Sequence, residues 1–288
     1  MELYTSIASS GVQYNLYPFS LNFEGNCARF SFIYEGRPVV SVRDNPAPNC
    51  LISGREAGDM VFRLPNKNRE AFFRARRIAP EKVYSLYQIH SRDVHTIGSP
   101  EDKSAAANSP LPPPETFARQ GDGMVSFAHD VFCAVTVADC LPVFLLDTEN
   151  RFFAVLHSGW KGTGIVLQAL EIMRRAGSRM EAIAAVLGPC IQGCCYNVDE
   201  ERAKLFEAEF GPSSPHTQGF DDFPLGQLSR HDNSSWYIDL RAANARLLAA
   251  KGVRNIAHCT DCTFTDTRLG SFRREGENAF TRMVAVVG

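Results

Sequence analysis

The chain has 288 residues and an almost balanced charge, with 30 Lys and Arg against 32 Asp and Glu. Hydrophobic residues make up 44% of it and charged residues 22%, which excludes disordered and fibrous proteins. A net charge of −2 and the lack of a basic run argue against binding to nucleic acid or to a membrane surface. We therefore expect a globular protein whose partners are small molecules.

The first part of the chain predicts short elements separated by turns. Residues 1–60 have the composition of short strands and turns, and a helix is predicted over 66–77, ending before Pro80. A strand is predicted over 83–89. Residues 98–120, rich in Ser, Pro and Ala, are interpreted as a long, flexible insertion loop.

The most apolar part of the sequence follows and predicts the core. The β-branched run at 131–137 is typical of a buried strand, and 165–175 has the apolar spacing of a helix. Further strands are predicted at 143–146, 152–156, 182–187, near 256 and at 283–287, and further helices at 199–210 and 240–251. Because strands and helices are mixed, we predict an α/β to α+β fold, a single layered domain over 1–288 with a mixed β-sheet and flanking helices.

Nine cysteines are the unusual feature of the composition. The first residues lack the basic and apolar regions of a signal peptide, and no apolar stretch reaches membrane-spanning length. We therefore predict a protein of the reducing cytoplasm, whose cysteines are core residues, metal ligands or nucleophiles rather than disulfides.

Three side chains that bind metals well occur where strands are predicted to end: His90, Cys140 and His157. Two imidazoles and one thiolate are a set that Zn²⁺ accepts, with a fourth position open for water or substrate. Copper is possible as well, because most nitrogen and sulfur sites bind Cu²⁺ more tightly than Zn²⁺. No local motif joins the three residues, so their meeting in space is a hypothesis. Taken singly, each is as well explained as a core cysteine or a loop histidine.

The residues around these candidates strengthen the hypothesis. Cys140 follows a buried strand, and Pro142 is expected to stop the strand ladder there. His157 precedes glycines and a helix N-terminus near Gly164, which suits an anion such as phosphate. Asp139 adjoins Cys140 and is a candidate for supporting the metal site or for carrying a proton.

Nine short motifs between residues 66 and 287 occur in a recognisable order. They include Gln88-Ile89-His90-Ser91, Gly121-Asp122-Gly123, Ala138-Asp139-Cys140-Leu141-Pro142 and His157-Ser158-Gly159-Trp160-Lys161-Gly162, followed by residues 187–191, 196–198, 238–240, 262–263 and 271–274. In this order they resemble the YfiH family, also called laccase-domain or multicopper polyphenol oxidase-like proteins and regarded as purine nucleoside phosphorylases. Residues 1–50 match the family poorly.

The resemblance implies a metal held by His90, Cys140 and His157, which would make these the catalytic residues together with Asp139. It also implies phosphorolysis of adenosine, inosine and methylthioadenosine to free base and ribose 1-phosphate, with deamination of adenosine as a side activity. Lys161 stands where the family usually has Arg, and a lysine cannot make a bidentate phosphate contact.

Phosphorolysis needs cationic groups around the phosphate, and the candidates are Lys161, Arg273 and Arg274. For the arginine pair, a solvated surface position is an equally good interpretation. The metal can activate a water for attack on C6 of adenine, or it can orient the phosphate.

Besides phosphorolysis, the sequence excludes one function and leaves two alternatives open. A four-copper laccase is excluded, because the seven histidines include no His-x-His pair. A cysteine hydrolase or amidase, with Cys140 as nucleophile and His157 as its base, is the main alternative. A non-catalytic metal-binding protein is the third possibility.

Five other cysteines lie in two groups, Cys190, Cys194 and Cys195 in one and Cys259 and Cys262 in the other. They have too irregular a spacing for a regular four-cysteine zinc site. Cys262 belongs to one of the family motifs and is given no role, and we interpret the other four as packing residues. No oligomeric state is predicted.

Overall fold

The computed structural model describes residues 4–7, 13–62, 65–100, 119–218, 220, 224–225, 227–232 and 234–288. The insertion loop predicted at 98–120 lies mostly outside the described residues, which leave out 101–118. The mixed α/β architecture predicted from the sequence is confirmed.

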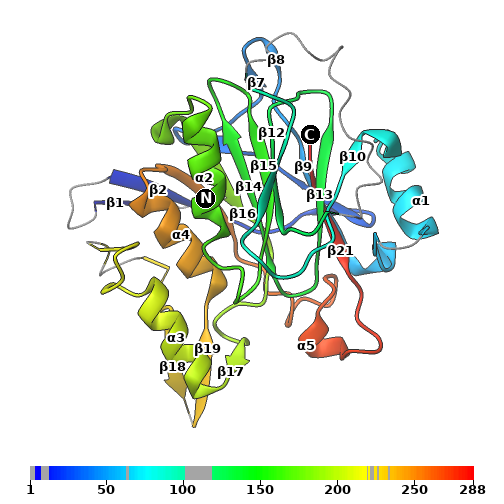
Figure 1. Cartoon of the computed structure of the whole chain (residues 1–288). Helices are drawn as coiled ribbons and strands as arrows, with labels where there is room; N and C mark the ends of the chain where they lie inside the picture. Colours follow the sequence, from blue (N-terminus) through cyan, green and yellow to red (C-terminus); the bar gives the residue numbers. More distant parts are fainter. Residues whose placement is uncertain are drawn as a thin grey trace.

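An eight-stranded mixed sheet runs through the middle of the molecule (Figure 1). In spatial order its strands are β1 (Tyr4–Ile7), β2 (Gln13–Phe19), β20 (Asn255–Cys259), β16 (Ile183–Leu187), β14 (Leu141–Asp147), β15 (Phe153–Ser158), β12 (Gly123–Ser126) and β11 (Val94–Ile97). Strands β14, β15 and β16 are buried along their whole length, which explains why their sequences are continuous apolar runs.

A six-stranded sheet packs against one face of the first. Its strands are β10 (Val83–Tyr84), β13 (Phe132–Val137), β21 (Met283–Val287), β9 (Cys50–Ser53), β4 (Cys27–Phe30) and β3 (Phe23–Glu24). Successive side chains of β14 point to opposite faces of the large sheet. Phe144 packs toward the six-stranded sheet, whereas Val143 packs toward the helices on the other face. The large sheet therefore has a layer of apolar side chains on each face, and a third, smaller layer lies between the six-stranded sheet and α1.

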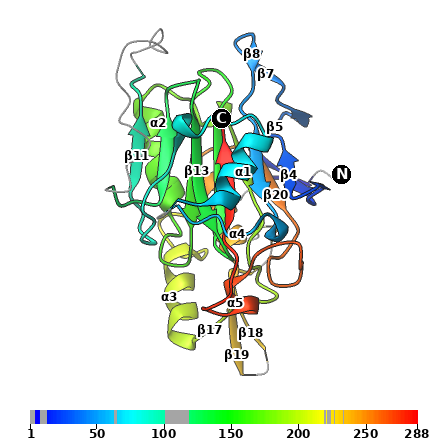
Figure 2. The same ribbon diagram turned by 90° about the vertical axis from the view of Figure 1, so that its right-hand side faces the viewer.

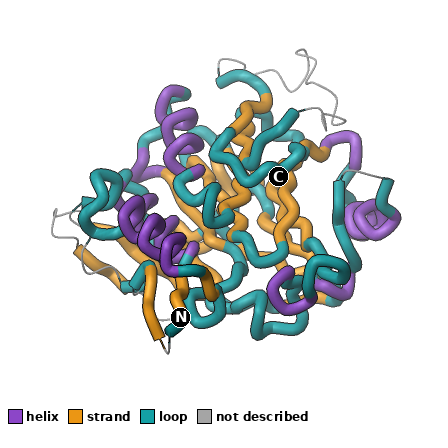
Figure 3. The backbone as a smooth tube through the Cα atoms, turned by 60° about the horizontal axis from the view of Figure 1, so that its bottom comes forward, coloured by secondary structure: helices purple, strands orange, loops and turns teal. Residues whose placement is uncertain are grey.

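Helices cover the outer faces of both sheets (Figures 1 and 2). Helices α2 (Ile165–Arg175) and α4 (Leu240–Ala250) lie on the large sheet, and α1 (Lys67–Ala75) lies on the six-stranded sheet. Figure 3 shows the strands gathered in the middle, with helices on either side. Within the described ranges, no helix has the length and apolar character needed to cross a bilayer.

The remaining elements are small. Helix α3 (Glu200–Phe210) packs on a three-stranded sheet of β17 (Asn197–Val198), β19 (Ser235–Ile238) and β18 (Ser229–Asp232), and α5 (Phe272–Glu275) follows near the C-terminus. Two hairpins are formed by β5 (Ile33–Tyr34) with β6 (Arg37–Pro38) and by β7 (Ser41–Val42) with β8 (Asn45–Pro46). Single 3-10 turns lie at Arg55–Ala57, Pro80–Lys82 and Met180–Ala182.

Two local predictions were wrong. The strand expected over 83–89 is limited to Val83–Tyr84. Pro142 does not stop the strand ladder but lies inside β14, opposite His157. The His157 N–H points away from Pro142 and donates to the Asp122 carbonyl at 2.7 Å, so this pair needs no N–H from the proline.

Candidate metal centre and active site

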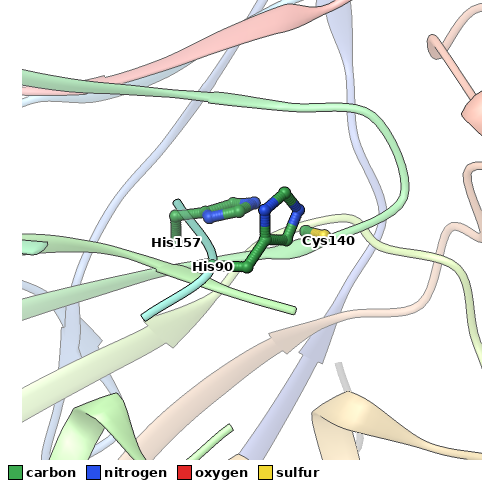
Figure 4. Close-up of side chains that lie close together, drawn as sticks. All are labelled: His90, Cys140 and His157. Carbon is green, nitrogen blue, oxygen red and sulfur yellow. The ribbon is translucent and has the colours of Figure 1, made fainter. Parts of the chain in front are cut away.

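The three predicted metal ligands come together in the structure. His90 lies on the loop before β11, Cys140 on the turn between β13 and β14, and His157 near the end of β15. One ligand atom of each lies within 4.8 Å of those of the other two, and Figure 4 shows the two imidazole rings beside the cysteine sulfur. His157 is buried, Cys140 is half-buried and His90 is exposed, so the group is open to solvent on one side.

The backbone around the group is shaped to bring these side chains together. His90 has φ 60° and Asp139 has φ 88°, left-handed conformations that turn the chain sharply next to a ligand. Gly159 lies against the group, and a Cβ there would come within 3.0 Å of Cys140 Sγ and 3.2 Å of His90 Cδ2. A glycine is therefore needed to leave room around the ligand atoms.

Asp122 connects two of the ligands and was not assigned a role from the sequence. Its fully buried carboxylate accepts hydrogen bonds from His157 Nδ1 at 2.8 Å and from the His90 backbone N–H at 3.0 Å. Its second oxygen accepts from the Ser91 N–H and hydroxyl at 2.6 and 2.9 Å. With Nδ1 of His157 held in this way, Nε2 is the nitrogen left to bind a metal. The only sequence signal was an acidic residue between two glycines.

The charges within the group support one another. Burial alone would raise the pKa of Cys140, but His157 and His90 beside it outweigh burial and lower that pKa to about 6. Burial alone would lower the pKa of His157, but Cys140 and Asp122 outweigh it and raise that pKa to about 9. The pKa of Asp122 is lowered, because hydrogen bonds from His157 and Ser91 outweigh its burial. The thiolate is thus the favoured form of Cys140 at neutral pH.

The donor set and its spacing fit a metal ion. Zn–N and Zn–S bonds of about 2.1 and 2.3 Å place the ligand atoms of a tetrahedral site about 3.5 Å apart, a small movement from the spacing here. The exposed side next to His90 leaves a position for water or substrate. Across the described ranges, the only other group of this kind consists of Cys194, Cys195 and Cys262.

A cavity of about 510 Å³ opens above the group, with His90, Cys140 and His157 in its wall. Much of the rest of the wall is aromatic, formed by Phe62, Trp160, Tyr196, Phe272 and Phe280. Flat aromatic side chains are suited to stack on a planar ring such as a nucleobase.

Two arginines also line this cavity, and neither was predicted from the sequence. The Arg202 guanidinium lies 4.5 Å from the centre of the Trp160 ring, and its buried Nε has no hydrogen-bond partner among the described residues. Arg282 forms an ion pair with Asp59 at 3.1 Å. Both bring positive charge to the wall of a cavity that also contains the candidate metal ligands.

The three cations predicted to bind phosphate lie outside the wall of this cavity. The Lys161 ammonium lies 5.7 Å from the Trp160 ring, and Arg273 donates from its guanidinium to the Asn197 carbonyl at 2.9 Å.

Arg274 is held by carbonyl groups of its own neighbourhood. Its guanidinium donates to the carbonyls of Phe264 and Asp266 at 3.1 Å and also to those of Thr263 and Leu269. Such a side chain holds its loop together, which explains why it does not reach the cavity.

Asp139 connects the Cys140 turn to two other segments. Its carboxylate accepts from the Thr263 hydroxyl at 2.6 Å and from the Arg273 backbone N–H at 2.7 Å. Both of its oxygens are thus used to hold neighbouring loops. The geometry favours a supporting role for Asp139 over a direct contact with the metal.

Comparisons with known proteins show what the chain is similar to. The family model described as multi-copper polyphenol oxidoreductase laccase matches residues 54–288. A Corynebacterium glutamicum protein named purine nucleoside phosphorylase is 31% identical over 248 residues, which cover 83% of this chain and 89% of that protein. A protein from an unknown prokaryotic organism, named adenosine deaminase, is 33% identical over 167 residues, covering 55% of this chain and 58% of that protein.

Solved structures show the same fold. The crystal structure of YlmD from Geobacillus stearothermophilus matches with a TM-score of 0.71 at 22% identity, covering 93% of this chain and 98% of that chain.

Proposed function

This chain belongs to the YfiH family, whose model is described as multi-copper polyphenol oxidoreductase laccase, and from that premise we propose that it is a metal-dependent purine nucleoside phosphorylase. Its substrates would be adenosine, inosine or methylthioadenosine together with phosphate, with deamination of adenosine as a side activity. The observation that carries the proposal is the His90, Cys140 and His157 group in the wall of an aromatic cavity large enough for a nucleoside. The names of similar proteins support it.

The proposed metal is Zn²⁺, with Cu²⁺ as the alternative, and a single ion is expected at this site. Two histidines and a cysteine suit either ion. A four-copper laccase remains excluded, because the histidines at 90, 95, 129, 157, 216, 231 and 258 contain no His-x-His pair for a copper cluster.

In this mechanism the metal would supply Lewis-acid polarisation of the bound substrate. The protein's own residues do the rest. Asp122 fixes the orientation of His157, and the aromatic wall, including Trp160 and Tyr196, would hold the base by stacking.

The phosphate would bind near Arg202 and Arg282, which replace the predicted Lys161, Arg273 and Arg274 as the proposed phosphate ligands because they line the cavity. The Arg202 Nε has no hydrogen-bond partner among the described residues and would be the donor offered to a phosphate oxygen, while the rest of the guanidinium pairs with Asp199 at 3.6 Å.

A cysteine hydrolase is the second candidate, favoured by one observation. The order Cys140, His157, Asp122 has the arrangement of a nucleophile, a base and a group that orients the base. In that reaction the Cys140 thiolate would attack the carbonyl carbon of an amide, the C–N bond would break as the amine leaves with a proton from His157, and water would then hydrolyse the thioester to free the thiol. A non-catalytic metal-binding protein would show neither activity.

Metal removal separates these functions. Zinc-loaded wild type is assayed for hypoxanthine release from inosine with and without phosphate, and it is compared with the His90→Ala variant. His129→Ala is the control, because it removes an exposed imidazole elsewhere. We expect His90→Ala to lose the bound ion and at least 100-fold in turnover, and His129→Ala to keep both.

If the protein's activity survives treatment with a chelator and is abolished by alkylation of Cys140, the protein is a cysteine hydrolase instead. Stoichiometric metal without turnover of any nucleoside would show a binding protein.

A further inference from the structure

A second group of potential metal ligands lies outside the cavity. The sulfur atoms of Cys194, Cys195 and Cys262 lie within 4.8 Å of one another, and those of Cys194 and Cys195 are 3.2 Å apart. Cys194 is exposed, Cys195 is half-buried and Cys262 is buried. Two adjacent thiols and a third from a distant part of the sequence thus meet at one place at the surface.

The backbone holds this cluster together from two loops. Cys194 and Cys195 lie in a turn closed by the Cys195 N–H, which donates to the Gln192 carbonyl at 2.8 Å. The loop with Cys262 is joined to it by the Thr263 N–H, which donates to the Cys190 carbonyl at 3.1 Å. Two segments are thereby fixed relative to each other before any ion binds.

A backbone N–H also points at one of the sulfurs. The Gln192 N–H donates to Cys262 Sγ at 3.5 Å. Hydrogen bonds of this kind stabilise a sulfur that carries negative charge, as a metal-bound thiolate does.

The donor set is one that selects a soft ion. It contains three sulfurs. Two nearby cysteines are not part of the group: Cys190, and Cys259, whose thiol donates to the Asp261 carboxylate at 3.4 Å. Metal–sulfur bonds of about 2.3 Å in a trigonal site require sulfurs about 4 Å apart, which matches this cluster after small shifts. Zn²⁺ normally takes four ligands, whereas thiolates select Cu(I) among soft ions.

The cluster is accessible from an open cavity at the surface. Cys194 lines an open cavity of about 330 Å³ that also contains Arg230 and Arg241. Arg230 donates to the Cys194 carbonyl at 3.4 Å, and the buried Arg241 Nε has no hydrogen-bond partner among the described residues. Arg230 also pairs with Asp232 at 3.2 Å and Arg241 with Asp239 at 3.5 Å, so carboxylates already neutralise part of this positive charge.

We propose that Cys194, Cys195 and Cys262 form a second metal site that binds Cu(I), separate from the group at His90, Cys140 and His157. The ion enters in its reduced state, so no electron is transferred. Each thiol that binds it releases one proton to solvent. The site goes beyond the proposed nucleoside chemistry and does not depend on it.

The test uses Cys140→Ala protein, which removes the only sulfur from the first group. Cu(I) is added without oxygen in the presence of glutathione as a competing thiol, and bound copper is counted after gel filtration. We expect one retained equivalent, with X-ray absorption showing three sulfur neighbours.

Two added substitutions locate the site. Cys194→Ser and Cys195→Ser, at positions that are not buried, should each reduce retained copper at least tenfold. Cys27→Ala is the matched control. It removes a thiol from β4 of the six-stranded sheet, which is not part of the cluster, and it should leave copper binding unchanged. The proposal is overturned if the Cys140→Ala protein retains no copper, if both serine variants retain it, or if equimolar Zn²⁺ displaces it.

Discussion

At the scale of single residues, the candidate site depends on groups that the sequence only partly indicates. His90, Cys140 and His157 were recognisable because few other side chains bind metals so well. Asp122 was not, because an aspartate before a strand has many possible roles. Hydrogen bonds between residues distant in the sequence become visible only in the folded chain.

Asp122→Asn is expected to weaken metal binding 10- to 100-fold. The asparagine oxygen can still accept from His157 Nδ1, but it lacks the negative charge that makes the imidazole a stronger ligand. Zinc affinity, measured by competition with a chromophoric chelator, checks this. Asp93→Asn, an exposed neighbour, should leave the affinity unchanged. Equal affinities of the Asp122 variant and the wild type would show that Asp122 does not tune the site.

Arg202→Ala is expected to lower kcat/KM for phosphate about 10- to 100-fold, because a hydrogen bond to a charged group is worth about 1.5–3 kcal/mol. Arg202→Lys should restore part of the loss by keeping the charge. Steady-state kinetics with varied phosphate measure both. Arg175→Ala is the matched control, since that exposed arginine pairs with Glu171 on α2 and does not line the cavity. An unchanged KM for phosphate would place the phosphate elsewhere.

At the scale of elements, prediction was accurate where apolar periodicity is strong. Helix α2 begins and ends at the predicted residues, and β21 matches its predicted range. It failed where pairing between distant strands decides the structure. Pro142 is tolerated in β14 because the N–H of its partner His157 donates to the Asp122 carbonyl on the opposite side of β15. This pairing cannot be recognised from the sequence around Pro142.

Strand β20 contains a buried histidine that should make stability depend on pH. Burial, with a contribution from Arg241, lowers the pKa of His258 from 6.5 to about 4. The unfolded chain therefore takes up a proton first as the pH falls, so stability is complete above pH 6.5 and is lost progressively toward pH 4.

Between pH 7 and pH 5 this group should remove about 2 kcal/mol from the free energy of unfolding. Denaturant unfolding of wild type and His258→Gln across this range measures the effect, with exposed His216→Gln as control. The His258 variant should lose less stability than the wild type. Parallel losses in the two proteins would contradict the assignment.

At the scale of the whole molecule, the site forms where the two sheets end beside each other. Cys140 follows β13 of the six-stranded sheet and His157 ends β15 of the eight-stranded sheet. Arg202 of α3 and Phe272 of α5 close the cavity from outside the sheets. Such a cavity could not be derived from the sequence, because its wall combines segments from residue 61 to residue 282.

The first part of the chain contributes strands to both sheets but no wall to the cavity. Strands β1 and β2 extend one edge of the large sheet, and the described cavity wall begins at Val61. The family match likewise begins at residue 54. The differences between residues 1–50 and the family pattern are therefore expected to affect the stability of the protein more than its choice of substrate.

The proposed activity of the His90, Cys140 and His157 group is phosphorolysis of a purine nucleoside. The most direct measurement follows inosine with zinc-loaded wild type and with Cys140→Ala, quantifying hypoxanthine and ribose 1-phosphate. We predict that the wild type forms the two products in equal amounts and only when phosphate is present, and that Cys140→Ala forms neither. Hypoxanthine without ribose 1-phosphate, or equal activity of the two proteins, would contradict the claim.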